Sequence, residues 1–484
     1  MSITNAIKRA LPKNSFVRSV LVLGGGTAGS QAILILSAPL LTRLYSTEAF
    51  GILAVFMAFL STISVISSLR YELAIPIAED EEEAVHVVVL AFLVALVISA
   101  LTLLIVALFR NPIANSVNVP ALANYLWLLP LSLLLLSTYQ IFNYWAIRVE
   151  AFRAIARTKL TQSVSSMAIQ IGGTALGPLA LILGNVIGQG AGMTTLGTLA
   201  IKNRWPTLQS IRFKDLRRVA NQHRKFPLIS TWSSLLYTIG TQLPPILFTV
   251  FFSPAAAGIY ALANRVLSLP MMLMGQAIGN VFFSKAADAR RDGSLGFLVA
   301  QVHENLAKIA MPPTFLLAAV GPDLFAWTFG SEWREAGVFV RILAPMLYFQ
   351  FIFSPISMIF SILGKQEKGF FLHGTMISTR GLSLTIGAYF GGLRLAVILF
   401  SLGSVLSYIV FLGQAFKVSG VCQIEMAKQT LHNFLYCALA FLPTFACFFL
   451  DLSSWIKISS FMITFFILIP FCYFPLSLKE QAKS

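Results

Sequence analysis

The sequence contains few charged residues, few cysteines and no long polar segment. Only 11% of its 484 residues are Asp, Glu, Lys or Arg, while 57% are hydrophobic. Soluble domains have about 25% charged residues, so this composition excludes an ordinary soluble enzyme or binding module and indicates a bilayer protein. The cysteines all lie in the last quarter and lack metal-ligand spacing, which argues against a disulfide framework or a metal site. They are Cys422, Cys437, Cys447 and Cys472.

Recognisable catalytic motifs are missing as well. The chain has no G-x-S-x-G, no phosphate-binding Gly-Lys loop and no H-E-x-x-H, and no connection is long enough to fold as a separate domain. We therefore expect no enzymatic activity, no ATP-driven mechanism within the chain and no cofactor.

Long hydrophobic runs are abundant instead. A bilayer-spanning helix needs about 20 mostly apolar residues, and on that criterion the sequence predicts an all-α polytopic membrane protein with about 14 transmembrane helices. The expected spans are 18–41, 50–69, 84–109, 121–145, 160–181, 184–201, 228–252, 256–283, 305–329, 337–363, 370–391, 393–416, 431–450 and 456–476.

The net charge of +16 follows the predicted topology. With a cytoplasmic N-terminus, most basic residues fall on cytoplasmic segments, eight of them between Lys202 and Lys225. Those that fall on the outer side are Arg43, Arg110, Arg334, Arg394 and Lys457. Positive loops are retained inside, so we expect a multi-pass membrane protein with both termini in the cytoplasm and no nucleic-acid partner.

A short internal repeat divides the chain. Ser46–Ile52 matches Ser253–Ile259 at an offset that spans six predicted helices, so the two copies share one orientation. The sequence therefore predicts two pseudo-symmetric six-helix bundles, 1–201 and 228–416. A basic cytoplasmic linker, 202–227, joins them, and 417–484 adds two helices and a tail.

Three arginines lie inside predicted spans, where a charge costs roughly 2.5–3.5 kcal/mol and so usually faces a cavity or a partner. Arg265 and Arg380 lie near mid-bilayer, and Arg341 lies closer to the outer end of its span. Guanidinium groups bind phosphate oxygens bidentately, so we expect these arginines to contact an anionic substrate. The plainer alternative is a structural arginine that bonds helix carbonyls or extends to the surface.

Polar side chains also recur at helical spacing on several spans. Gln170, Gln276 and Asn280 are candidate substrate contacts on such faces, with interhelical hydrogen bonding as the alternative. Acidic residues within the spans are scarce, and Glu72 and Asp323 are the candidates for ion coupling. His86 and His373 are isolated histidines with no pattern around them.

Three stretches resemble the Wzx-type O-antigen and capsule polysaccharide flippases of the multidrug/oligosaccharidyl-lipid/polysaccharide exporter superfamily. They are Leu41–Gly51 continuing to Leu69–Pro76, Gly258–Pro270 running on to Phe283, and Gly321–Phe325 followed by Phe329–Gly337. The resemblance implies a bundle that works by alternating access on an undecaprenyl-diphosphate-linked oligosaccharide. Arg265 falls where the related murein-precursor flippases have a cavity arginine before a Leu-Pro pair.

The leading hypothesis is thus translocation of such a glycan from the cytoplasmic to the outer leaflet of a bacterial inner membrane, for O-antigen, capsule or exopolysaccharide biosynthesis. Membrane lipids and a polysaccharide polymerase are the expected partners. A cation-coupled multidrug exporter of the same superfamily is the main alternative, although cavity carboxylates to bind the ion and the drug are scarce. A membrane polymerase or glycosyltransferase is the third, although the outer connections are short.

Overall fold

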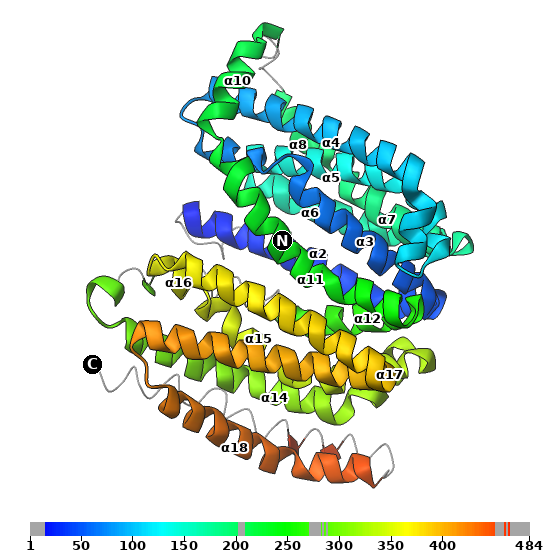
Figure 1. Ribbon diagram of the computed structural model, residues 1–484, viewed down its shortest axis with the longest axis vertical. Helices are drawn as coiled ribbons and strands as arrows, with labels where there is room; N and C mark the ends of the chain where they lie inside the picture. The colour runs from blue at the N-terminus through cyan, green and yellow to red at the C-terminus, as the bar shows by residue number, and fades with distance from the viewer. Residues whose placement is uncertain are drawn as a thin grey trace, which may run out of the picture. The chain divides into compact units, whose positions relative to one another are not determined.

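The computed structural model describes residues 15–201, 209–270, 282, 285–286, 289–450, 459–460 and 463–464. Every regular element within these residues is helical, which confirms the predicted all-α membrane class. The helices of the first part (Figure 1) are α2 (Ser15–Leu44), α3 (Thr47–Ser67), α4 (Glu81–Ser116), α5 (Leu128–Arg148), α6 (Phe152–Gly172), α7 (Pro178–Gly190), α8 (Met193–Ile201), α10 (Phe213–Gln222), α11 (Thr231–Phe251) and α12 (Pro254–Pro270).

The second part contains fewer but longer helices. They are α14 (Leu295–Phe329), α15 (Arg334–Ile356), α16 (Ile359–Ile362), α17 (Gln366–Ser419) and α18 (Gln423–Phe449). Short turns join elements along the chain: the 3-10 turns η1 (Tyr71–Ile77), η2 (Pro120–Asn124), η3 (Thr174–Leu176) and η6 (Ser331–Trp333), and the π-helical turn η4 (Phe226–Ser230).

Eight stretches of described helix are long and apolar enough to cross a membrane. They lie at Thr47–Ser67, Glu81–Ser116, Pro178–Ile201, Phe226–Phe251, Leu295–Phe329, Ser331–Ile356, Glu367–Ser419 and Gln423–Cys447. Each predicted span up to 431–450 falls on described helix, the span 256–283 mainly over its first half. The last span, 456–476, lies mostly outside the described residues.

Local sequence explains where several helices begin and turn. Ser46 caps α3 by accepting a hydrogen bond from the Ala49 amide at 3.2 Å, and Asp80 caps α4 through the Glu83 amide at 2.7 Å. In α17 the helix is interrupted at Gly392, whose φ of 76° favours glycine. The predicted spans 370–391 and 393–416 meet at this residue.

The chain divides into two compact units, Met1–Gly258 and Ile259–Ser484. In the first unit α2 packs against α6, α6 against α7, α4 against α5, and α11 against α3. Because α11 packs against α3, the units divide at Gly258, after the segment 202–227. The predicted domain boundaries, with a linker at 202–227, stay a prediction.

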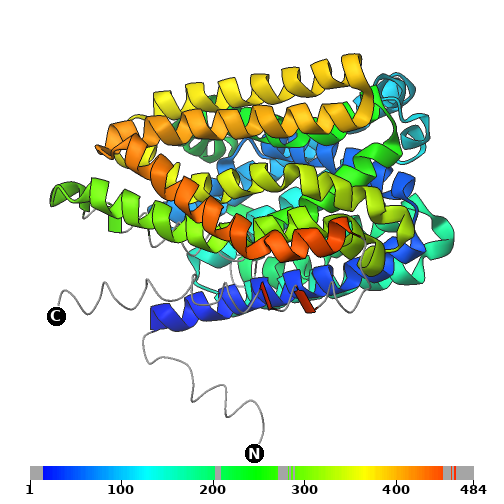
Figure 2. The same ribbon diagram turned by 90° about the horizontal axis from the view of Figure 1, so that it is seen from below.

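In the second unit α14 lies along both α15 and α18, and α15 also contacts α17 (Figure 2). The α14–α15 contact is close because two glycines face each other. A Cβ on Gly321 would lie 2.8 Å from the carbonyl oxygen of Gly337, and a Cβ on Gly337 would meet the Gly321 backbone. Such small residues let helices approach where lipid provides no hydrophobic force between them.

Candidate functional site

The predicted site residues are divided between the two units. Glu72 and Gln170 lie in the first unit, and Arg265, Asp323, Arg341 and Arg380 lie in the second. Gln276 and Asn280 lie outside the described residues. Their roles in binding or coupling stay predictions, and the contacts of the described residues constrain what each can do.

Arg380 joins the two arms of α17, the helical parts before and after Gly392. Its Nε donates to Ser404 Oγ at 3.1 Å and its Nη2 donates to the Tyr408 hydroxyl at 2.5 Å. The guanidinium carbon also lies 5.1 Å from the centroid of the Tyr408 ring and 5.9 Å from that of Phe400, within cation–π range. The guanidinium is thus held in place by neutral groups, and these contacts do not compensate its positive charge.

The same cluster connects α17 to α12, the helix of Arg265. The ring of Tyr260 on α12 meets Phe400 edge-on, with centroids 6.1 Å apart. Arg265 follows Tyr260 by five positions and is partly buried, and its backbone carbonyl accepts a hydrogen bond from Ser268 at 3.0 Å. Two of the three predicted arginines therefore lie on helices of one unit that touch each other.

Arg341 makes a different kind of contact. Its Nε and Nη2 donate to the carbonyl oxygens of Ala318 and Ala319 on α14, each at 2.9 Å. Pro322 follows Ala318 by four positions and lacks the N–H that would bond the Ala318 carbonyl in a regular helix. The side chain thus satisfies a carbonyl freed by a proline, which is the structural alternative foreseen for such arginines.

The two predicted coupling carboxylates differ in exposure. Asp323 pairs with Arg334 at 2.9 Å, and its side chain is 40% exposed. Glu72 is 2% exposed, accepts a hydrogen bond from Ser68 and lies 3.6 Å from Arg70. Leu69 and Arg70 have left-handed backbone angles, with φ of 49° and 62°, a conformation that costs non-glycine residues about 1–2 kcal/mol. The Glu72 contacts help to hold this strained turn.

Gln170 lies between α6 and α7. Its side-chain Nε2 donates to the Leu181 backbone carbonyl at 3.1 Å, and its backbone carbonyl accepts a hydrogen bond from the Tyr45 hydroxyl. The polar face of α6 meets the glycines of α7, since Cβ atoms on Gly184 and Gly188 would collide with Gln170 and Ser166. This polar face of α6 therefore serves close helix packing against α7.

Sequence reasoning missed one cation in the first unit. The predicted span 160–181 leaves Lys159 on a cytoplasmic connection. In the structure α6 begins at Phe152, and Lys159 lies two turns inside this helix. Its Nζ donates to Thr27 Oγ1 of α2 at 3.2 Å. The sequence does not show where this helix begins, because the nearby Arg153 and Arg157 are typical of a charged connecting loop.

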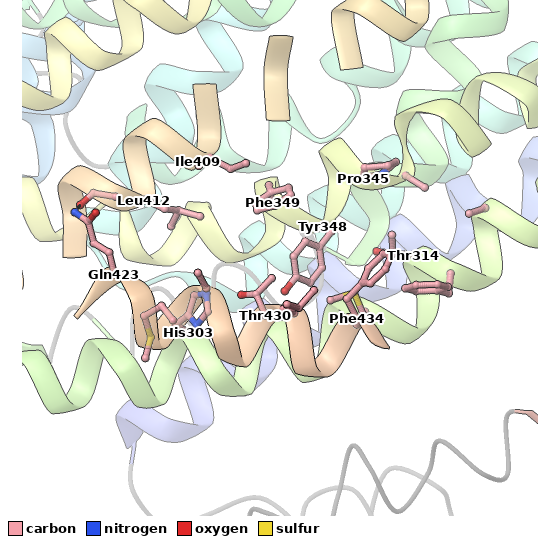
Figure 3. A pocket seen from close by; sticks show the side chains of 18 of the residues that line it. His303, Thr314, Pro345, Tyr348, Phe349, Ile409, Leu412, Gln423, Thr430 and Phe434 are labelled. Atoms are coloured by element: carbon pink, nitrogen blue, oxygen red, sulfur yellow. Dashed lines mark hydrogen bonds between the residues drawn. The ribbon is translucent and has the colours of Figure 1, made fainter. Parts of the chain in front are cut away.

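The second unit contains an apolar cavity of about 630 Å³ between α14, α15, α17 and α18 (Figure 3). Its walls are mainly aliphatic and aromatic side chains, among them Phe315, Phe349, Phe416, Phe434 and Phe445. This volume falls within the range of small-molecule sites, about 300–1,000 Å³.

Polar groups enter this cavity at a few points. Tyr348 and Thr430 lie next to each other in its wall, and His303 and Gln423 lie toward the end where α14 and α18 begin (Figure 3). The Nδ1 of His303 is buried without a hydrogen-bond partner among the described residues. The cavity thus combines an apolar body with a polar end, and on the predicted topology that end lies on the cytoplasmic side.

Metal binding has no structural support in the part of the chain that the structure describes. There, no group of three or more His, Cys, Asp or Glu side chains comes together. The described chemistry is instead that of partly buried or exposed guanidinium groups, amides and hydroxyls that bond other parts of the chain, together with an apolar cavity in the second unit.

Comparisons with known proteins agree with this fold. The chain is 23% identical over 181 residues to the teichuronic acid biosynthesis protein TuaB of Bacillus subtilis (strain 168), covering 37% of each chain. It is 25% identical over 326 residues to the succinoglycan biosynthesis transport protein ExoT of Rhizobium meliloti (strain 1021), covering 65% of this chain and 63% of ExoT. The matches thus span less than two thirds of these relatives.

Solved structures show the same architecture. The lipid II flippase MurJ in an inward closed conformation aligns with a TM-score of 0.72 at 14% identity, covering 93% of this chain and 98% of MurJ. An inward-facing multidrug resistance MATE family transporter of the MOP superfamily aligns with a TM-score of 0.67 at 14% identity, covering 82% and 95%. At these identities the likeness concerns the fold.

Family membership rests on a broader match. The family model described as polysaccharide biosynthesis protein matches residues 40–338, more than half of the chain. The chain therefore belongs to the polysaccharide biosynthesis protein family, as a multi-pass membrane protein with the fold of the MurJ and MATE transporters.

Proposed function

We propose that this protein flips an undecaprenyl-diphosphate-linked oligosaccharide from the cytoplasmic to the outer leaflet of a bacterial inner membrane by alternating access. The glycan would serve surface polysaccharide biosynthesis as an O-antigen, capsule or exopolysaccharide unit. The observation that carries the proposal is the apolar cavity of the second unit, with its polar end where α14 begins. A site of this kind suits one stretch of a prenyl chain whose remainder stays in lipid.

Affinity for a prenyl chain would come from packing. Lipid tails are as apolar as the cavity wall, so moving a chain from lipid into the cavity gains almost no hydrophobic transfer energy. A shaped wall of rings such as Phe315, Phe434 and Phe445 gains dispersion contacts with a branched chain instead. The cavity would thereby favour a prenyl tail over straight acyl chains.

The diphosphate requires positive charge, which the second unit supplies. Arg380 is held by neutral partners, and Arg265 lies on the neighbouring helix α12. Guanidinium groups bind phosphate oxygens in pairs, so these two residues are the proposed headgroup contacts. A related polysaccharide polymerase is a proposed partner, and cytoplasmic termini follow from the positive-inside distribution.

The alternative is a cation-coupled multidrug exporter of the same superfamily. The buried carboxylate of Glu72 is the observation that favours it, since such a group can bind a proton or Na⁺. However, Glu72 is already bonded to Ser68 and close to Arg70. A cationic drug would also meet the positive charge of Arg380.

The test is flipping of an undecaprenyl-diphosphate oligosaccharide in proteoliposomes. We expect protein-dependent flipping that is abolished by both Arg265→Ala and Arg265→Lys, because a lysine lacks the bidentate fork. We also expect a severe loss with Ala427→Trp, which fills the cavity, and near-normal flipping with Leu439→Trp. Leu439 lies on the same helix, is 71% exposed and does not line the cavity.

Three outcomes would contradict the proposal as a whole or in part. Absence of flipping with every lipid-linked glycan, together with ion-driven efflux of a cationic dye, would favour the exporter. Flipping that survives Ala427→Trp would remove the cavity from the mechanism, and flipping that survives both Arg265 changes would make that residue structural.

A further inference from the structure

The segment between the sixth and seventh predicted spans contains an exposed basic face. Lys214, Arg217 and Arg218 are all exposed on α10, and their spacing puts them on one side of the helix, opposite the buried Val219. In the described part of the chain these three side chains form no ion pair. The acidic residue of the helix, Asp215, accepts a hydrogen bond from the Arg212 amide at 3.1 Å.

The opposite face of α10 is fixed to the first unit. Val219 is fully buried in a core cluster formed with residues of η1, α4 and α5, and the start of α4 lies beside α10 (Figure 1). The Tyr71 hydroxyl donates to the Ala220 carbonyl at 3.4 Å, and burial raises the pKa of this hydroxyl. His223, which caps the helix, contacts Glu83 of α4 at 2.7 Å. The basic face is therefore held in a set direction.

Exposed apolar side chains come directly after the last basic residues of this segment in the sequence. Leu228, Ile229 and Trp232 are 66%, 63% and 61% exposed, directly after Arg224 and Lys225. They begin the apolar stretch Phe226–Phe251, which is long enough to cross a membrane. Tryptophan at the end of a span is typical of the membrane–water interface. The change from exposed basic to exposed apolar residues therefore indicates the boundary between headgroups and hydrocarbon.

We propose that the basic face of α10, formed by Lys214, Arg217 and Arg218, binds the phosphate groups of anionic phospholipids in the leaflet at which α11 enters the membrane. The ligand is bulk anionic lipid such as phosphatidylglycerol, distinct from any transported glycan lipid. The inference therefore does not depend on the proposed function.

Charge complementarity and position together favour a lipid surface. Clustered Lys and Arg beside a transmembrane helix bind anionic headgroups, and the attraction decays within about 10 Å at ordinary ionic strength. α10 ends nine residues before Thr231, where α11 begins, so its charges remain near the headgroup layer. Phe213, 81% exposed at the edge of this face, adds an apolar side chain that can enter the interface.

The experiment compares lipid binding by the full chain in detergent, measured by native mass spectrometry during titration with phosphatidylglycerol or phosphatidylethanolamine. We expect tighter binding of phosphatidylglycerol, weakened by salt. The triple variant Lys214→Ala, Arg217→Ala, Arg218→Ala should lose about tenfold or more in affinity, since each charge near an anionic surface contributes roughly fivefold. The substituted residues are exposed, so the thermal unfolding midpoint should change little.

The matched control removes the same charge elsewhere. Lys365, Lys368 and Lys417 are also exposed and lie on predicted cytoplasmic segments. They do not form one helix face, so their triple replacement by Ala should lower affinity by clearly less than the α10 triple variant does. Equal losses in both variants, or no loss in either, would overturn the proposal. So would equal binding of both phospholipids by the native chain, or binding of undecaprenyl diphosphate in place of phosphatidylglycerol, which would make the face a substrate-capture site. Salt-independent binding by the native chain would also contradict it, whatever the variants do.

Discussion

Gly51 and Gly258 pack the first turns of α3 and α12 directly against each other. A Cβ on Gly51 would collide with the carbonyl oxygen of Pro254, and a Cβ on Gly258 would collide with that of Thr47. Both distances would be well inside 3.0 Å, which real Cβ atoms essentially never show. The two glycines occupy equivalent positions of the internal repeat, so the repeated segments contact each other through the same residue.

Replacing either glycine by alanine should destabilise this contact. The obstacle is backbone on both sides, which a rotamer change cannot relieve, so Gly51→Ala and Gly258→Ala should each lower the free energy of unfolding by about 1–3 kcal/mol. Once one substitution has separated the helices, the second should cost less, which makes the pair non-additive. Unfolding in mixed detergent micelles measures both effects.

Gly24→Ala and Gly25→Ala provide the matched control. These glycines lie inside α2, and a Cβ on either would have nothing within 4 Å. Alanine there should raise stability by about 0.5–1 kcal/mol, because it restricts the unfolded chain more than glycine does. If Gly51→Ala and Gly258→Ala behave like these controls, the tight packing of the two repeats is wrong.

The positions of the helices could be predicted from the sequence because a bilayer imposes a simple rule. Every backbone group in hydrocarbon must bond within the chain, so apolar runs of about 20 residues form helices. The repeat motif was also informative, since Ser46 and Ser253 each accept a hydrogen bond from the amide three residues later, both at 3.2 Å. A helix cap depends on a few adjacent residues, so it can be predicted from the sequence.

Side-chain partners were harder to foresee. Helical spacing places Gln170 on a polar face of α6, but it cannot say that the face meets the glycines of α7. The sequence predicts that Arg341 and Arg380 both contact an anionic substrate, whereas in the structure one bonds carbonyls beside a proline and the other bonds Ser404 and Tyr408. The aromatic cavity could not be predicted either, because its lining residues come from four separate helices, α14, α15, α17 and α18.

The link between Arg341 and Pro322 can be tested by a double-mutant cycle. Arg341→Ala should lower the free energy of unfolding by about 1.5–3 kcal/mol, because it removes charged hydrogen bonds to Ala318 and Ala319. Pro322→Ala restores an N–H that can bond the Ala318 carbonyl within α14. In the Pro322→Ala background, the cost of Arg341→Ala should therefore fall by about 1 kcal/mol.

Two results decide that cycle. Additive costs would show that the arginine does not compensate for the proline, and would leave room for the predicted substrate role of Arg341. Pro355→Ala serves as a control, since it restores an amide in α15 whose helical acceptor is Phe351, away from Arg341 and from these carbonyls. It should leave the cost of Arg341→Ala unchanged.

Arg380 is the residue for which binding and structure can be separated most cleanly. Tyr408→Phe removes the hydroxyl that accepts from Arg380 at 2.5 Å but keeps the ring at 5.1 Å from the guanidinium, so the charge stays and becomes less well oriented. We expect Tyr408→Phe to reduce flipping of a diphosphate-linked glycan by several-fold and stability by about 1 kcal/mol. Arg380→Gln should nearly abolish flipping, because it removes the charge that we propose contacts the diphosphate. Ser407→Ala is the control, since Ser407 lies next to Tyr408 and bonds the Gly403 carbonyl of its own helix. Normal flipping by a folded Arg380→Gln protein would confine Arg380 to joining the two arms of α17.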